Sequence, residues 1–175
     1  MMRELRAIAL AYDPLQDRML AVVNPGHLDS WSFWLTRRLV LEVLGRLPAA
    51  LAGSSAMLRQ APAQYRDELA AFEREAAIAS TDPAMQRTDQ ALMTDHARVA
   101  ELVVNLAIAE QGEHFMLQLT GERGAQAAGV LERAELQRML QMIYDETAKG
   151  GWLGLPGSPV QADPAQAGAA TPTRH

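Results

Sequence analysis

One eleven-residue pattern occurs twice in this chain and constrains its fold more than any other feature. The first copy spans residues 34–44 and the second spans residues 130–140. Because strand-like sequence precedes each copy, we predict that one structural unit is used twice. Aligned without gaps, the two regions place large apolar residues at the same positions, namely Leu35/Leu131, Val40/Leu136, Val43/Met139, Leu44/Leu140 and Leu47/Ile143.

The first predicted unit consists of three strands and a helix. Its strands are predicted over residues 7–12, 19–23 and 31–35, and its helix over residues 36–47. The first strand is predicted because large residues alternate with alanine, a period of two that is typical of a strand with one buried face. Asn24-Pro25-Gly26 would end the second strand. Thr36 is placed to cap the N-terminus of the helix.

The second predicted unit repeats this order. Its strands are predicted over residues 102–108, 115–120 and 128–131, and its helix over residues 133–149. The first of these strands has the clearest alternation in the chain. Gly150-Gly151 would end the helix, with Lys149 favourably placed in its last turn.

These two units predict an α+β fold. A three-stranded unit with one helix buries little apolar surface by itself. Two βββα repeats could combine into a six-stranded antiparallel sheet with both helices on one face. The connection between them is too long for a bare loop, so we predict a helical insert that begins near Pro62 and ends near Ala79.

The predicted organisation has four parts. Residues 153–175 contain few large apolar groups, which predicts a flexible tail whose removal leaves stability nearly unchanged. The helical insert could lie over the sheet or reach to a partner. The predicted boundaries are 1–52 for the first βββα unit, 53–90 for the helical insert, 91–152 for the second βββα unit and 153–175 for the tail.

The composition bounds the class of protein. The chain has 175 residues, a net charge of -5 and a pI of about 5.4, a balance that disfavours a protein that coats nucleic acid. It has no cysteine, which excludes disulfides and zinc–thiolate sites. No stretch approaches the ~18 consecutive apolar residues of a membrane span. The N-terminus also lacks a signal peptide pattern. We therefore expect a cytoplasmic protein without a membrane partner.

No motif for catalysis, metal binding or phosphate binding stands out. The four histidines lack the spacing of metal ligands, and the carboxylates near the predicted hairpin ends suit chain reversal. The sequence has no glycine-rich phosphate loop and no nucleophile elbow. We therefore predict no cofactor and favour a non-enzymatic protein, although scattered residues could still assemble an active site.

Two groups of residues are candidates for binding a partner. Trp34, at the end of a strand, adjoins Arg37 and Arg38 at the start of a helix, and an exposed tryptophan there would mark an interface. The second group is Tyr65, Leu69 and Phe72, the apolar stripe of the helical insert.

These features favour a non-enzymatic binding or assembly module. We expect it to form a homo-oligomer or to bind a protein partner, because an antiparallel sheet with helices on one face leaves its other face uncovered. One alternative is a protein that binds single-stranded nucleic acid through Trp34, Arg37 and Arg38, by stacking and phosphate contacts. The corresponding part of the second predicted unit, residues 128–134, has no aromatic residue, which argues against a nucleic-acid platform that is used twice. A second alternative is an enzyme whose site is not visible in the sequence.

Overall fold

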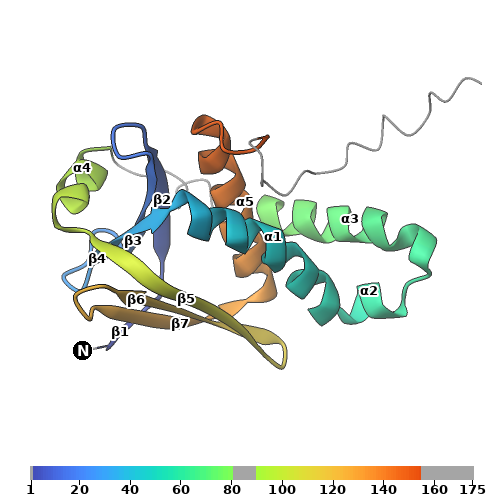
Figure 1. Cartoon of the computed structure of the whole chain (residues 1–175). Coiled ribbons are helices and arrows are strands. Elements are labelled where there is room, and N and C mark those ends of the chain that lie inside the picture. The colour runs from blue at the N-terminus through green and yellow to red at the C-terminus, as the bar shows by residue number, and fades with distance from the viewer. Residues whose placement is uncertain (1, 81–89, 155–175) are drawn as a thin grey trace, which may run out of the picture.

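A computed structural model describes residues 2–80 and 90–154 and contains one seven-stranded sheet (Figure 1). The strands follow the order β1-β7-β6-β5-β4-β3-β2 across the sheet. The strands are β1 (Met2–Glu4), β2 (Ile8–Asp13), β3 (Arg18–Val23), β4 (Trp31–Thr36), β5 (Glu101–Gln111), β6 (His114–Gly121) and β7 (Gln126–Glu132). The helices are α1 (Arg37–Ser54), α2 (Ala56–Gln60), α3 (Arg66–Ala79), α4 (Gln90–Val99) and α5 (Arg133–Lys149), with a 3-10 turn over Ala63–Tyr65.

In each half of the chain three consecutive strands lead into a helix, and in the first half the additional strand β1 precedes them. The helix α1 begins after Thr36, whose Oγ1 accepts a hydrogen bond from the Leu39 amide at 3.3 Å. The helix α5 begins after Glu132, where a capping box with Glu135 satisfies two backbone amides. The use of one structural unit twice, and a superposition of the two halves in the predicted register, stay predictions.

The sheet is mixed, which corrects the prediction of an antiparallel sheet with six strands. Strand β4 pairs with β5 in parallel, and the additional strand β1 pairs in parallel with β7. Parallel neighbours require a long crossover connection, and the helical segment between β4 and β5 provides one. The three-residue strand β1 is too short to show a period of two.

The sheet curls until its two edge strands come together. Only residues 5–7 separate β1 from β2, although these strands stand at opposite ends of the strand order. Asn24 holds this crossing: its Oδ1 accepts from the amides of Arg6 at 2.9 Å and Ala7 at 3.2 Å, and its Nδ2 donates to the Glu4 carbonyl at 2.7 Å. Glycine is required at 129, because a Cβ there would lie 2.2 Å from the Leu5 carbonyl oxygen.

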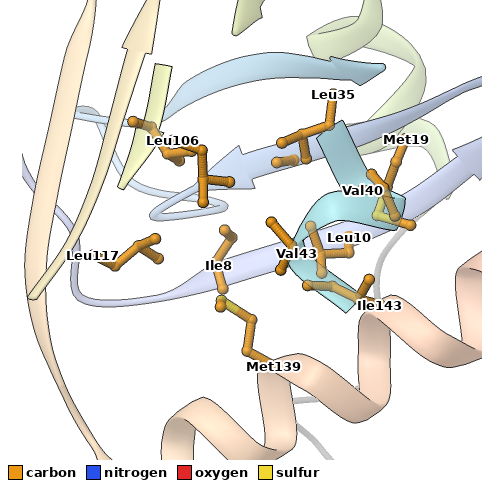
Figure 2. Close-up of a pocket in the computed structure, with 12 residues that line it drawn as sticks. Ile8, Leu10, Met19, Leu35, Val40, Val43, Leu106, Leu117, Met139 and Ile143 are labelled. Carbon is orange, nitrogen blue, oxygen red and sulfur yellow. The ribbon is translucent and has the colours of Figure 1, made fainter. Parts of the chain in front are cut away.

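The main core lies between the concave side of the curled sheet and the helices α1 and α5. Phe33, Phe115 and Leu136 are fully buried in it. Figure 2 shows side chains of the sheet converging on Val40 and Val43 of α1 and on Met139 and Ile143 of α5. The gap among them measures ≈ 20 Å³ and is lined by apolar groups alone. A gap of that size holds about one water molecule, and an apolar lining keeps it dry.

The helix α4 covers part of the opposite face of the sheet, whereas α1 and α5 pack together in the main core. Leu20, Val22 and Trp34 form a second core with Met93 of α4. Small residues of strand β2, such as Ala9, allow α4 to approach closely. The sheet therefore has helices on both faces, as Figure 1 also shows.

The remaining helices form an arm beside the sheet. Helix α1 continues past Pro48 to Ser54 and so runs through the boundary predicted between residues 52 and 53. Helices α2 and α3 then return the chain, and α3 packs against α5 (Figure 1). The insert thus contacts α5, and α4 covers part of the opposite face of the sheet. Of the predicted tail, only Leu153 and Gly154 lie within the described residues.

Candidate functional site

Strand β5 has an open edge. It pairs with β4 only through Phe33–Glu101 and Trp34–Leu102, because β4 ends at Thr36 and the chain then leaves the sheet as α1. On its other side, β5 pairs with β6 along nearly its whole length. Among the described strands, none pairs with the β4-side edge of residues 103–111. Backbone donors and acceptors along an unpaired edge are a template for another strand.

An apolar groove lies beside this open edge, between α1 and β5. Its volume is ≈ 160 Å³. Leu106 and Ile108 of β5 are half-buried and face the apolar stripe of α1, because β5 continues beneath the helix after β4 has ended. The groove is lined by Leu39, Glu42, Val43, Arg46, Leu47, Ala50, Leu106 and Ile108.

The rim of the groove is charged but balanced. Glu42 and Arg46, one helical turn apart on α1, form an ion pair of 3.0 Å. Both side chains are exposed, so the pair contributes little to stability. Because the charges of Glu42 and Arg46 cancel, the rim that α1 contributes to the apolar groove has no net charge.

The open edge lacks the usual protection against strand pairing. Residues 103–109 read Val-Val-Asn-Leu-Ala-Ile-Ala, without proline, lysine or any other charge. Natural edge strands often carry such residues, or a bulge, to prevent pairing with another chain. The one irregularity of β5 falls between Val103 and Asn105, which leaves residues 105–109 regular.

The outer face of β5, β6 and β7 carries no charged side chain along its central rows. Ala107 lies beside Gln118, which lies beside Ala128, and the next row contains Ala109, Met116 and Val130. This face continues directly to the open edge. A strand added there would therefore extend a neutral surface on the outer side and meet the apolar groove on the helix side.

The residues predicted around Trp34 do not form a common surface. Trp34 is only 8% exposed and packs beneath α4 against Met93, so it serves the second core. Arg37 lies 3.6 Å from the carboxylate of Asp17, and Arg38 is exposed. A stacking platform that combines Trp34 with the two arginines would require α4 to leave the sheet.

The apolar stripe of the insert is partly available. Tyr65 is 49% exposed and Phe72 is 63% exposed, whereas Leu69 is half-buried. The spacing of these residues places them along one side of α3 and of the 3-10 turn that precedes it. They form a second exposed apolar feature, on the arm and apart from the groove residues on β5.

A polar cluster holds the arm against α5. Arg133 Nη2 donates to Glu73 Oε2 at 2.7 Å, and Ser55 donates to the other oxygen of Glu73 at 2.6 Å. Arg133 also donates to the Leu51 carbonyl and to the Ser54 hydroxyl. A cavity of ≈ 90 Å³ adjoins this cluster. Because the carboxylate and the guanidinium already neutralise each other, we interpret the cluster as a tie between α3 and α5.

The described residues assemble no group of three or more histidine, cysteine, aspartate or glutamate side chains that could hold a metal ion. His96 Nε2 on α4 lies 3.3 Å from the hydroxyl of Ser30, the residue that precedes β4. Within the same part of the chain, no helix has the length and apolar character needed to cross a membrane.

Comparisons of this chain with protein-family models, with curated proteins and with solved structures found no match. The candidate site therefore rests on its own geometry.

The open edge was missed in the sequence, although a signal for it exists. The alternating apolar pattern of the strand that begins near residue 102 extends further than that of residues 31–35, and a longer strand beside a shorter one must leave an edge unpaired. That signal has meaning only when the two strands are known to be neighbours.

Proposed function

We propose that this protein is a non-enzymatic binding or assembly module that takes an extended polypeptide segment along the open edge of β5. The segment would pair with the backbone of residues 103–111 and place alternate side chains in the groove beside α1. It would belong either to another copy of the chain or to a different protein.

The single observation that supports this proposal most is the coincidence of an unprotected edge with an apolar groove. Backbone pairing provides affinity for any extended chain, and pockets for alternate side chains provide selectivity. Leu106 and Ile108 line the groove on the same side of the strand. The bound segment should therefore have apolar residues at every second position.

A peptide selection tests this proposal. Random nine-residue peptides displayed on phage are selected on immobilised protein, and each recovered peptide is then measured by fluorescence anisotropy. We expect recovered peptides to alternate apolar and polar residues. Their affinity should fall at least tenfold in Ile108→Lys, which places a charge in the groove, and should be retained in Phe72→Lys, which changes the exposed stripe of α3.

Peptides that bind both variants equally would place the binding surface elsewhere. A monomeric protein that selects no peptide would contradict the proposed function.

A further inference from the structure

We infer that the segment that occupies the open edge is β5 of a second copy, paired antiparallel to the first about a two-fold axis through Ala107. This inference rests on the proposed function and names its partner. A two-fold axis makes the interface isologous, so the same edge must be complementary to itself. Three features of the described residues meet that condition.

The first feature is the self-complementary order of side chains in β5. With Ala107 opposite Ala107 of the second copy, Leu106 falls opposite Ile108 and Asn105 falls opposite Ala109. Directly opposed residues of an antiparallel pair project to the same face. Leu106 and Ile108 would then meet on the helix side, where each lines the groove of its own chain.

Shifting the axis to Ile108 is less favourable. That register would place Leu106 opposite Glu110 and bring a carboxylate to the apolar groove. A two-fold axis placed between two neighbouring residues is excluded by the pleat. Residues that project to different faces would then be opposed, and the apolar side of one strand would lie on the outer face of the other.

The second feature is the charge of the region. Residues 103–109 contain no ionisable side chain, so two copies meet there without repulsion despite a net charge of -5 on each chain. The rim residues Glu42 and Arg46 lie one helical turn apart on α1, beside the groove. The two-fold axis reverses their order in the second copy, which favours Glu42 facing Arg46 across the interface.

The third feature is the small size of the side chain on the axis. Ala107 projects to the outer face beside Gln118, where two bulky groups directly opposed would crowd each other. The outer faces of the two copies would then join as one neutral surface of six strands, three from each chain.

Disulfide trapping tests this register, because the chain has no cysteine of its own. In Ala107→Cys the two thiols would belong to opposed residues, whose Cα atoms lie about 4.5–5.5 Å apart, within disulfide range. The matched control is Gln118→Cys, on the same row and face but one strand further from the axis. The Cα atoms of residue 118 in the two chains would be about 14 Å apart, or three strand spacings, which is beyond disulfide reach.

We expect Ala107→Cys to form a covalent dimer under mild oxidation at micromolar concentration, at least tenfold faster than Gln118→Cys. Adding Ile108→Lys to the Ala107→Cys chain should lower its cross-linking rate to that of Gln118→Cys. Equal cross-linking rates for the two cysteine variants, or no cross-linking of either, would overturn the self-pairing. If peptides were still captured at the edge in that case, the proposed function would stand with a different protein as partner.

Discussion

Leu136 and Leu140 show what the repeated pattern contributes residue by residue. Both lie on the stripe of α5 that faces the sheet, and Leu136 is 0% exposed. Their counterparts in the first half, Val40 and Leu44, are also buried, on α1. The repeated apolar positions are therefore core positions in both halves.

We predict that Leu136→Ala and Leu140→Ala each lower the free energy of unfolding by about 2–5 kcal/mol, the range for truncation of a packed leucine. Chemical denaturation measures the loss. The matched control is Asp145→Ala on the exposed side of the same helix, which should change stability by less than about 0.5 kcal/mol. Losses below about 1 kcal/mol for both leucines would show that this stripe is not the buried one.

Asp17 adds a pH-sensitive contact. Its carboxylate accepts a hydrogen bond from Trp152 Nε1 at 2.8 Å, and chiefly this bond lowers the pKa of Asp17, helped by Tyr12 and Arg37. A lowered folded-state pKa means that the contribution to stability is present above the unfolded value of about 4. It is lost as the pH falls through the lower, folded-state pKa.

We predict that the fluorescence of Trp152 changes in acid, below about pH 4, when Asp17 is protonated. The Asp17→Asn variant should lack this change, because its side chain has no carboxylate to titrate. In the control Asp13→Asn the change should persist, since Asp13 accepts from the amides of Leu15 and Gln16 instead. An identical acid transition in wild type and Asp17→Asn would disprove the assignment.

Among the helices, α4 determines how much of the outer face of the sheet is exposed. It buries Trp34 and closes one half of the outer sheet face, through a core that is small and rich in alanine. Among the α4 side chains that the structure describes, Met93 is the large buried one in that contact. The helix should therefore depend strongly on this residue.

We predict that Met93→Ala destabilises the protein by about 2–5 kcal/mol and increases the accessibility of Trp34 to the neutral quencher acrylamide. Stern–Volmer quenching of a chain in which Trp31 and Trp152 are phenylalanine isolates this signal. The exposed residue Arg98 on the same helix provides the control Arg98→Ala. Unchanged quenching in Met93→Ala would mean that another contact holds α4.

The elements that could be predicted from the sequence are those with their own local signals. The helix over residues 133–149 was predicted with its observed bounds, because a periodic apolar stripe ends at Gly150-Gly151. Strand β1 could not be predicted because three residues carry no period. Helix α4 could not be predicted because Met93 and Ala97, its described contacts with the sheet, are too few to form an apolar stripe. The parallel pairing of β4 with β5 depends on a contact between distant segments, so the open edge could not be predicted.

At the scale of the whole molecule, the curled sheet explains why one edge is left open. The edge strands β1 and β2 are joined by residues 5–7, and the Tyr12 amide of β2 donates to the carboxylate of Glu146 on α5. The sheet instead opens where β4 leaves β5 and turns into α1. The backbone edge of the uncharged residues 103–109 is thereby left unpaired.

The solution mass, measured by light scattering across a range of concentrations, tests the central claim of self-association through β5 most directly. For wild type we predict twice the chain mass of 19.1 kDa at high concentration, with dissociation on dilution. The Ile108→Lys variant should stay at the chain mass with an unchanged circular dichroism spectrum, while Phe72→Lys should still dimerise. A wild-type protein that keeps the mass of one chain at every concentration, or a folded Ile108→Lys variant that dimerises as wild type does, would contradict the claim.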